Sequence, residues 1–566
     1  MLAEFLLVSV SEAERLSNSN RVSFVAGLVM HVSPFRLLLL LPHALFFLFP
    51  YTPAHGGHVL VFPGEYSHWL NMRSIMEELV RRNHSVTVLV ADASPSVNYN
   101  SSRDATKFNF LVFKVPFSRA DVDGLTQDFI NFSMYESHVS SPLQKFLKMG
   151  DWMRRSVDYG MRQCDSMLKN QQLMATLRGA AFDAVLLDPM VMCADLVADV
   201  LGLPFVVSLR FSFGGVMERH CGHAPAPPSY VPAAPLPYGD HMTFVERLTS
   251  AVTYAWLSVV TEVFWSLSLD SYYSEVKGSP SSFCRTLGNA DVWLIRTFWD
   301  LETPRPFPPN FKHVGGLHCK PANQLPEDLE AFVQSSGDAG VVVVSFGSMV
   351  TNLTTERADV IAAAFGRIPQ KVIWRYSGDT PRTLAANTKL SDWIPQNDLL
   401  GHPKTRVFVT HGGTNGLYEA VYHAVPLVGI PLFADQPDNL ARLSRRGAAI
   451  VLDFNHLTSD ELTEALHAAI NQPSYKSSMQ HLSALHRDQP VAPLSTAAFW
   501  VEFVMRHGGA RHLRLASHEL NWFQYHSVDT GAALLAAIAT AAALCWGGVR
   551  FFLRRCSQRR RREKND

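Results

Sequence analysis

Residues 393–436 read WIPQNDLLGHPKTRVFVTHGGTNGLYEAVYHAVPLVGIPLFADQ. An apolar strand at 407–409 runs into a glycine-rich turn at 410–416, and a helix with apolar residues at helical spacing follows. Such a turn lets the backbone approach a ligand closely, and the free N–H groups and positive dipole at the helix start bind anions. A second strand, at 425–430, delivers Asp435 and Gln436, whose carboxylate and amide suit the hydroxyls of a sugar.

The motifs WxPQ, HGGxNG and PLFADQ, at these intervals, resemble the signature of the membrane-bound UDP-glycosyltransferases, above all the animal UDP-glucuronosyltransferases. The resemblance covers nearly everything from about Gly56 to the C-terminus. It implies an α/β fold of GT-B type, in which two doubly wound Rossmann-like domains face a cleft. The first domain would bind the acceptor and the second the UDP-sugar. A single C-terminal transmembrane helix would follow.

The alternation of apolar strands and helices agrees with this interpretation, because repeated βαβ units are typical of parallel sheets. The proline-dense stretch 303–310 predicts a linker. The expected parts are an upstream extension and signal peptide (1–55), the acceptor-binding domain (56–302), the linker (303–310), the UDP-sugar-binding domain with closing helices (311–527), the transmembrane helix (528–552) and a cytosolic basic tail (553–566).

Both ends of the chain carry targeting signals. Arg36 precedes a short apolar run that ends near small residues, which is typical of a signal peptide, and Met30 is the expected start. The apolar run 530–552 is long enough to span a bilayer, and the basic block after it predicts a cytosolic C-terminus. The body is then lumenal, in a type I protein of the endoplasmic reticulum membrane. Lys564 and Arg562 form an imperfect version of the family's dilysine retrieval signal.

The charge balance, the sequons and the cysteines exclude some classes of protein and support others. Fifty Lys and Arg balance fifty Asp and Glu, so no net charge attracts nucleic acid. Four sequons fit a lumenal glycoprotein: Asn83, Asn100, Asn131 and Asn352. The seven cysteines form no metal motif, and we expect the five in the body to be free, mostly buried thiols. The aromatic helix 244–273 is interpreted as a core or acceptor-pocket helix in preference to a membrane-surface patch.

Two residues of the first domain are candidates for the catalytic machinery. His68 follows the first strand at a loop-to-helix junction, and its resemblance to the family's SHW histidine implies the general base. Asp188 ends a later strand and would fix the tautomer of His68. From the residues alone, a capping or core role stays open for His68, and an N-cap role for the following helix stays open for Asp188.

For the donor, the resemblance implies a set of binding residues in the second half of the chain. His411 and the turn N–H groups would bind the pyrophosphate, Ser345 a phosphate, Trp393 and Gln396 the uridine, and Glu419 the ribose. Arg296 resembles a donor-domain contact that neutralises a phosphate or the sugar carboxylate. The full set is Arg296, Ser345, Trp393, Gln396, His411, Gly412, Gly413, Asn415, Gly416, Glu419, Asp435 and Gln436.

The implied reaction is inverting transfer of glucuronic acid from UDP-glucuronate to a hydroxyl of a small lipophilic acceptor, such as a phenol, steroid or xenobiotic. The products would be a β-D-glucuronoside and UDP. UDP-glucuronate is a co-substrate, and we expect neither a cofactor nor a metal, since no DxD motif stands in a suitable place. UDP-glucose, UDP-galactose and UDP-N-acetylglucosamine remain alternative donors. A non-catalytic lumenal regulatory or lipid-binding subunit remains an alternative of another class, and homo- or hetero-oligomers with family members stay open.

Overall fold

The computed structural model describes residues 56–566, except 210–214, 235, 351, 563 and 565–566. The chain divides into two units, Met1–Gly56 and Gly57–Asp566, and everything below concerns the second. The expected signal peptide and the start at Met30 lie outside the described residues.

The first domain contains a seven-stranded parallel sheet in the order β3-β2-β1-β4-β5-β6-β7. Its central strands are apolar and fully buried, as expected where helices cover both faces of a parallel sheet. The strands are β1 (His58–Phe62), β2 (Ser85–Ala91), β3 (Asn109–Phe113), β4 (Ala184–Leu187), β5 (Phe205–Leu209), β6 (Val292–Ile295) and β7 (Phe311–His313). The helices are α4 (Ser67–Arg81), α5 (Ser102–Ala105), α6 (Arg119–Asn131), α7 (Pro142–Leu168), α8 (Gln171–Gly179), α9 (Ala194–Leu201), α10 (Phe244–Trp265), α11 (Ser271–Lys277) and α12 (Phe283–Leu287), with π-helical turns η1 (Phe132–Glu136), η3 (Met217–Cys221) and η4 (Ser266–Asp270).

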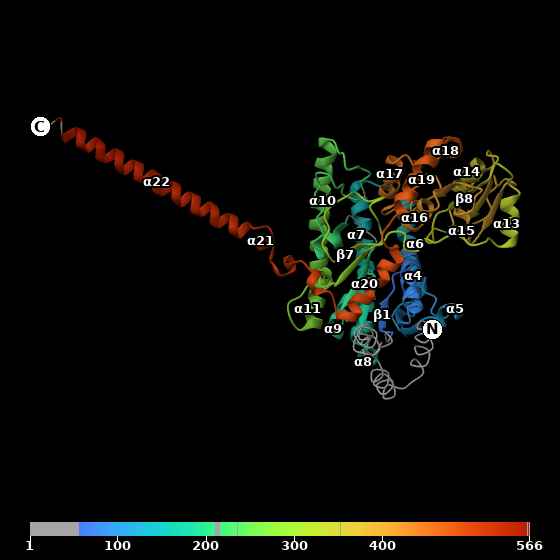
Figure 1. Ribbon diagram of the computed structural model, residues 1–566, viewed down its shortest axis with the longest axis horizontal. Helices are drawn as coiled ribbons and strands as arrows, with labels where there is room; N and C mark the ends of the chain where they lie inside the picture. Colours follow the sequence, from blue (N-terminus) through green and yellow to red (C-terminus); the bar gives the residue numbers. More distant parts are fainter. Residues whose placement is uncertain (1–55, 210–214, 235, 351, 563, 565–566) are drawn as a thin grey trace, which may run out of the picture. The chain divides into compact units, whose positions relative to one another are not determined.

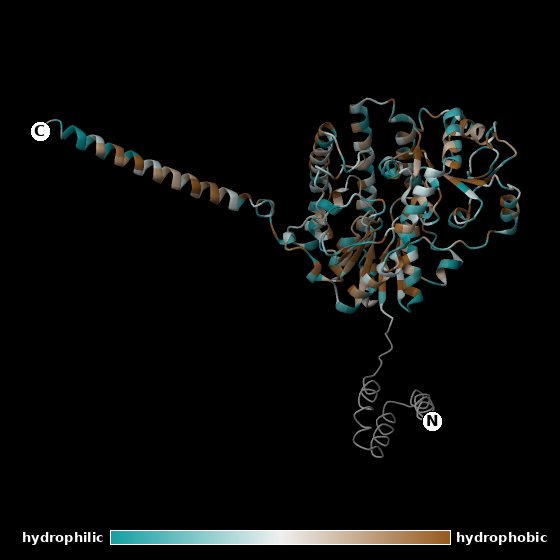
Figure 2. Ribbon diagram, turned by 45° about the horizontal axis from the view of Figure 1, so that its top comes forward, coloured by the Kyte–Doolittle hydropathy of each residue, from teal (hydrophilic) through white to brown (hydrophobic). Residues whose placement is uncertain are grey.

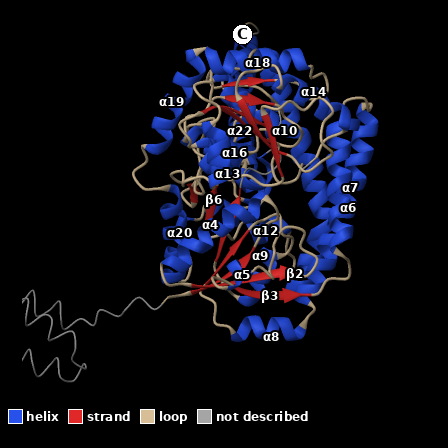
Figure 3. Ribbon diagram, turned by 90° about the vertical axis from the view of Figure 1, so that its right-hand side faces the viewer, coloured by secondary structure: helices blue, strands red, loops and turns tan. Residues whose placement is uncertain are grey.

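The second domain contains a six-stranded parallel sheet in the order β10-β9-β8-β11-β12-β13. Figure 3 shows the strands of both sheets in red between blue helices. The strands are β8 (Val341–Ser345), β9 (Lys371–Arg375), β10 (Thr388–Ser391), β11 (Thr405–Thr410), β12 (Leu427–Gly429) and β13 (Ala449–Val451). The helices are α13 (Glu327–Gln334), α14 (Thr355–Phe365), α15 (Gln396–Leu400), α16 (Thr414–Tyr422), α17 (Gln436–Arg445), α18 (Ser459–Asn471) and α19 (Pro473–Arg487). The last part of the chain contains α20 (Pro493–His507), the 3-10 turns η5 (Arg511–Leu513) and η6 (Ala516–Glu519), α21 (Trp522–Tyr525) and α22 (Val528–Arg562).

Two of the expected domain boundaries differ from this arrangement. The strand β7, which follows the expected linker at 310, pairs with β6 in the first sheet. The helix α20 also packs into the core of the first domain, where Ala497 and Val501 are buried beside Met72. The chain therefore visits the second domain between about residues 314 and 490 and then returns to the first.

The segment between β6 and β7 is fastened to the second domain by a buried polar network. The backbone N–H of Phe298 donates to the hydroxyl of Tyr418 on α16 at 2.6 Å. Asp300 accepts from His486 on α19 at 2.6 Å, and Glu302 pairs with Arg442 on α17 at 2.7 Å. Both acidic side chains are buried. We call residues 298–302 the brace, since they belong to the chain of one domain and contact three helices of the other.

A second contact between the domains is apolar. Ile130 of α6 and Met134 of η1 are buried in the same cluster as Val350 and Phe454 of the second domain. Tyr135 adds a ring contact with Phe454 at 5.8 Å. Packing of this kind joins the two domains close to the loops that follow their strands.

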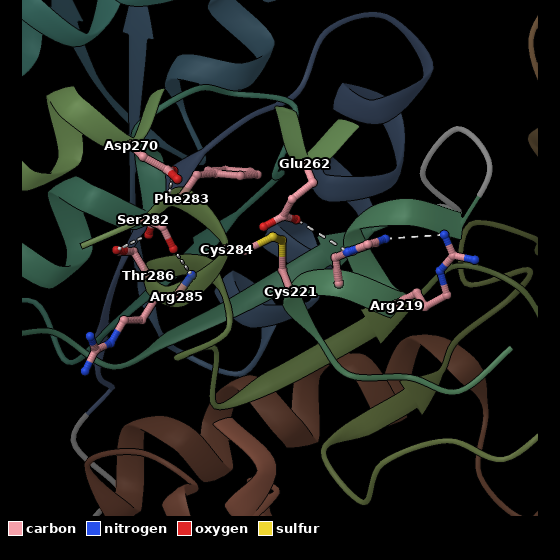
Figure 4. Close-up of a disulfide and its surroundings, with 10 residues drawn as sticks. Arg219, Cys221, Glu262, Asp270, Ser282, Phe283, Cys284, Arg285 and Thr286 are labelled. Carbon is pink, nitrogen blue, oxygen red and sulfur yellow. Dashed lines mark hydrogen bonds and ion pairs between the residues drawn. A yellow bond between two sulfur atoms is a disulfide. The ribbon is translucent and has the colours of Figure 1, made fainter. Parts of the chain in front are cut away.

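The prediction of free thiols was wrong for four of the five body cysteines. Disulfides join Cys164 of α7 to Cys193, and Cys221 of η3 to Cys284 of α12. Figure 4 shows the second of these beside Glu262 and Arg219. The paired cysteines are 29 and 63 residues apart in the sequence, so no local motif identifies them as partners. They come together only through the packing of helices around β4 and β5. Cys319, Cys545 and Cys556 are free.

Two helices in the described residues are long and apolar enough to cross a membrane: α10 with η4 and α11, and α22. None of the residues of α22 is buried, and Figure 2 shows its apolar body and its hydrophilic end. In α10 only Ser250, Tyr254 and Trp265 are buried. Figure 1 shows α10 at the edge of the body. The interpretation of 244–273 as a core helix was wrong, because many of its apolar side chains, among them Leu248, Trp256 and Val259, are exposed. A role in the acceptor pocket stays a prediction.

Candidate active site

His68 and Asp188 form the centre of the site in the first domain. His68 stands in the first turn of α4, just after β1, and Asp188 directly follows β4, the neighbouring strand. The carboxyl ends of adjacent parallel strands meet at one edge of a sheet, which brings the two residues together. The Nδ1 of His68 lies 2.6 Å from Oδ2 of Asp188. With Nδ1 bound to the carboxylate, Nε2 is the nitrogen that can accept a proton.

Arg296 lies beside this pair, at the end of β6. Its Nη2 is 3.4 Å from Oδ2 of Asp188 and 3.1 Å from Nδ1 of His68. The expectation of a donor-domain contact was wrong in its placement, because β6 belongs to the first sheet. The side chain is buried, and its Nε and Nη1 have no hydrogen-bond partner among the described residues. Two charged N–H groups therefore remain available for an anion.

The electrostatics of the pair favour an ionised carboxylate. Burial acts to raise the pKa of Asp188, but the charge and hydrogen bond of His68 and the charge of Arg296 outweigh it, so the pKa lies below its ordinary value. Burial lowers the pKa of the Arg296 guanidinium. A carboxylate that stays charged holds the Nδ1–H tautomer and stabilises the imidazolium that forms when His68 takes a proton.

The loop before His68 is strained and firmly held. Tyr66 has φ 53° and ψ −119°, a conformation that costs of order 1–3 kcal/mol for a residue with a side chain. Its N–H donates to Oγ of Ser96 at 2.6 Å, and the carboxylate of Glu65 accepts from the hydroxyls of Ser94 and Ser96. Gly64 leaves no room for a side chain, since a Cβ there would lie 2.7 Å from both Asp188 Oδ2 and the Cβ of His68. This loop fixes the position of the histidine.

In the second domain, the glycine-rich turn lies between β11 and α16 as predicted. Gly412 has φ +89°, a conformation that favours glycine. The ring of His411 lies between this turn and the turn after β8: a Cβ at Gly413 would be 2.5 Å from its Nε2, and one at Gly347 2.6 Å. Ser345, the last residue of β8, accepts the N–H of Gly347 at 3.4 Å. The turn after β8 and the glycine-rich turn before α16 thus meet at His411, and a helix start of this kind suits an anion.

Two of the residues expected to bind the uridine and ribose, Gln396 and Glu419, lie together at α16. Gln396, the first residue of α15, donates from Nε2 to Glu419 Oε2 at 2.5 Å. Burial raises the pKa of Glu419 to about 7. Trp393 lies in the loop just before α15 and is 68% exposed, so its ring is open to a flat partner.

The residues expected to meet the sugar are engaged in different ways. Asn415, in the first turn of α16, accepts from Asn71 of α4 at 2.7 Å and so bonds across the two domains. Asp435 caps α17 and accepts from Asn439. Gln436 is buried, and its Oε1 accepts the N–H groups of Leu432 and Phe433 at 2.8 and 3.0 Å. Gln436 therefore holds the loop in front of Asp435 with its carbonyl.

Sequence reasoning missed three residues at the site. Asn71 stands three positions after His68, and helical spacing within the SHWLN stretch could have revealed it. Glu65 gave no signal, because its serine partners lie in a separate loop. Phe129 of α6 contacts Phe433 at 5.7 Å, and no local pattern predicts a contact between two domains. Among the residues that the structure describes, no group of His, Cys, Asp or Glu is arranged to hold a metal ion.

The model of the family described as UDP-glucoronosyl and UDP-glucosyl transferase matches residues 57–563. The chain belongs to this family. It is therefore a glycosyltransferase that uses a UDP-sugar. The matched residues of this transferase include both sheets, the His68–Asp188 pair in the first domain and the glycine-rich turn in the second.

Relatives support the same assignment. This transferase is 50% identical over 489 residues to UDP-glucuronosyltransferase 2A2 of Homo sapiens, covering 86% of this chain and 90% of that protein. It is 50% identical to UDP-glucuronosyltransferase 2A3 of Cavia porcellus, with 86% and 92% covered. It is 49% identical to UDP-glucuronosyltransferase 2C1 of Oryctolagus cuniculus, with 87% and 97% covered.

Solved structures confirm the GT-B fold of this transferase. The glycosyltransferase of kitacinnamycin superposes with a TM-score of 0.53 at 18% identity, covering 81% of this chain and all of that one. The calicheamicin glycosyltransferase CalG4 gives a TM-score of 0.52 at 19% identity, with 80% and 98% covered. These likenesses concern the fold of the two domains.

Proposed function

We propose that this transferase moves glucuronic acid from UDP-glucuronate to a hydroxyl of a small lipophilic acceptor, with inversion at the anomeric carbon. The observation that carries the proposal is the His68–Asp188 pair at 2.6 Å, on the helix that bonds through Asn71 to the start of α16. A base and an anion-binding turn on neighbouring helices suit a displacement in which the acceptor hydroxyl loses a proton and the donor sugar loses UDP.

In this mechanism Nε2 of His68 accepts the proton of the acceptor hydroxyl as its oxygen attacks the anomeric carbon. Asp188 stabilises the resulting imidazolium through Nδ1–H. The bond from the anomeric carbon to the diphosphate breaks, and UDP leaves with the electron pair. The attack comes from the face opposite the leaving group, so an α-linked donor gives a β-linked product.

The leaving diphosphate would be held without a metal. His411 and the N–H groups of Gly412, Gly413 and Gly416 would bind it at the start of α16, with Ser345 at the end of β8. Trp393 would stack on uracil, Gln396 would bond the uridine and Glu419 the ribose. Asn415, Asp435 and Gln436 would lie nearest the sugar.

Glucuronate is the proposed sugar because the guanidinium of Arg296 has hydrogen-bond donors to spare beside its ion pair with Asp188. The Nε and Nη1 groups of buried Arg296 lack partners among the described residues and can donate to an anionic group of the donor, a phosphate or the sugar carboxylate. The relatives described above are UDP-glucuronosyltransferases by name, and Phe433 of the PLFADQ motif resembles the phenylalanine of the branches that use glucuronate.

The proposed setting is the endoplasmic reticulum membrane, with the body lumenal and the basic tail cytosolic. Two disulfides in the first domain support it, because such bonds persist in oxidising compartments. The sequon residues Asn83, Asn100, Asn131 and Asn352 are all exposed, as glycan acceptors must be. The helix α22 would be the anchor, and Lys564 with Arg562 the retrieval signal.

The test is a microsomal assay of phenols and steroids against UDP-glucuronate, UDP-glucose, UDP-galactose and UDP-N-acetylglucosamine. We expect a conjugate with UDP-glucuronate and a loss of about 10²–10⁴-fold in His68→Ala. The control is His456→Ala, which removes an exposed histidine of the second domain. Equal rates with UDP-glucose would overturn the donor assignment, and full activity of His68→Ala would overturn the base.

A further inference from the structure

One face of α10 and η4 is apolar and open to solvent. Its side chains recur every three or four residues, so they form a single stripe, and they are between 51% and 79% exposed. We call this stripe the α10 face; it consists of Leu248, Val252, Trp256, Val259, Val263 and Leu267.

The α10 face is nearly free of charge. Between Arg247 and Asp270 the sequence holds one ionisable acid or base, Glu262, and its carboxylate lies 3.6 Å from Nδ1 of His220. The opposite side of the helix packs on the body through Tyr254 and Trp265. An outward face of this length without charge is uncommon on a soluble surface and marks a site of contact with another apolar phase or protein.

Helix α7 extends the apolar surface. The ring of Phe146 lies 6.4 Å from that of Trp256, and Leu143 and Leu147, in the same helical turns, are also exposed. Lys145 and Lys148 are exposed among them. Long basic side chains beside apolar ones suit an interface between hydrocarbon and water, because they keep the charged end in the polar layer.

Residues 219–223 connect α10 to the start of α22. The guanidinium of Arg219 lies over the ring of Tyr254 at 4.4 Å and bonds the hydroxyl of Ser258, both on α10. Four residues later, His223 stacks on His518 at 4.1 Å and contacts the ring of Tyr525 at 5.3 Å. The chain that leads into α22 is therefore fastened to the body at the segment that also holds α10.

The start of α22 is correspondingly close to the body. Tyr525 precedes Val528 by three residues, which span at most about 10 Å. The exposed aromatic residues Trp522, Phe523 and Tyr525 come just before the apolar helix, where membrane proteins place aromatic belts. A bilayer that takes up α22 therefore begins within a short distance of the segment that holds α10.

We propose that the α10 face docks on the lipid bilayer, with α10 lying in the interface while α22 crosses the membrane. The proposal rests on the anchoring role of α22 given above. Because α10 is held beside the start of α22, the bilayer that surrounds α22 is the nearest apolar phase to the α10 face. The face carries no charged side chain whose burial in lipid would cost free energy. The body would then touch the membrane at two places, α21–α22 and the α10 face.

The test uses the full chain reconstituted in phosphatidylcholine nanodiscs, in a Cys545→Ser, Cys556→Ser background. Cys319 stays in place because it is partly buried against the core of the second domain, and the same background without an added cysteine shows any labelling there. A fluorophore is attached to Val252→Cys or Val259→Cys. The matched control is Gln172→Cys, an exposed polar position on α8 of the same domain. A chain that keeps Cys545 reports on the anchor itself. Quenching by nitroxide-labelled phosphatidylcholine is compared with quenching by aqueous iodide.

We expect strong lipid quenching at 545 and lipid quenching at 252 and 259 several-fold above that at 172. A second variant, Val259→Cys with Val252→Asp, should lose most of the lipid quenching, since an added charge opposes burial. If 545 is quenched while 252 and 259 behave like 172, the docking is overturned and the anchor stands. If 545 is not quenched, the anchor fails and the docking with it. Shielding of 252 and 259 from both quenchers, with a doubled protein mass per disc, would assign the α10 face to a second copy of this chain and overturn the proposal.

Discussion

Asn71 Nδ2 donates a hydrogen bond of 2.7 Å to Asn415 Oδ1, and this bond joins the helix that carries His68 to the helix that begins at the glycine-rich turn. Asn415 in turn donates toward the backbone carbonyl of Ser67 at 3.4 Å. Asn71 is buried, so the pair is shielded from water. The relative position of base and donor therefore depends on two amide side chains.

The first prediction concerns this pair. Asn71→Ala should lower kcat/KM about fivefold, since a buried neutral hydrogen bond contributes about 1 kcal/mol. In a double-mutant cycle with Asn415→Ala, the coupling energy should be of the same order. Ser74→Ala, on the same helix, removes a hydroxyl that bonds only its own helix backbone and should have little effect. Strictly additive losses in the double mutant would show that the bond does not couple the domains.

The second prediction concerns the close approach at Gly64. Gly64→Ala should push the Asp188 carboxylate or His68 from its position and lower kcat by about 10²-fold, because small misplacements of catalytic groups are costly. Binding of UDP, measured by calorimetry, should be unchanged, since the proposed donor residues other than Arg296 lie in the second domain. Gly124→Ala in α6 is the control, as a Cβ there meets no atom within 4 Å. Normal turnover in Gly64→Ala would contradict this account.

The third prediction is a pH dependence of stability due to Glu419. Burial raises the pKa of its carboxyl from 4.5 to about 7, so between these values the folded state holds a proton that the unfolded state has lost. Stability from this group is therefore full below about pH 4.5 and is lost as the pH rises to about 7. Without UDP, the melting temperature of the wild type should therefore fall relative to that of Glu419→Gln as the pH rises from about 4.5 to about 7. A pH-independent difference would mean that folding leaves the pKa of Glu419 unchanged.

The fourth prediction concerns the disulfides. Peptide mapping without reduction should recover Cys164 linked to Cys193 and Cys221 linked to Cys284. Cys164→Ser should lower the free energy of unfolding by about 2–4 kcal/mol. Cys556→Ser, at an exposed free thiol, is the control and should leave stability unchanged. Alkylation of Cys164, Cys193, Cys221 and Cys284 in the untreated protein would rule out both bridges and remove their support for a lumenal body.

Much of the fold could be predicted because its signals are local. The strand β8 reads VVVVS and the strand β11 runs directly into glycines, so composition and turn chemistry alone indicate buried parallel strands and an anion site. His68 and Asp188 could be paired because each follows an apolar strand at the carboxyl edge of the same predicted sheet. What failed depends on distant contacts. The return of α20 to the first domain, the disulfides and the position of Arg296 are set by packing between residues far apart in the chain.

The outward face of α10 shows a different limit. Aromatic and apolar residues at helical spacing occur both in cores and on membrane-facing helices, and the pattern does not say on which side a partner lies. Only the burial of Tyr254 and Trp265, against the exposure of Trp256 and Val259, separates the two.

The brace has a consequence for how substrates exchange. Its contacts, Asp300 with His486 and Glu302 with Arg442, are buried, so a wide separation of the domains would expose these charges and break the pairs together. Such pairs break at a cost of several kcal/mol. We therefore expect the two sheets of this transferase to keep nearly the same relative position while UDP-sugar enters and UDP leaves. The brace restricts domain opening on the side of α16, α17 and α19. Exchange should then depend on movements of side chains and loops around the site.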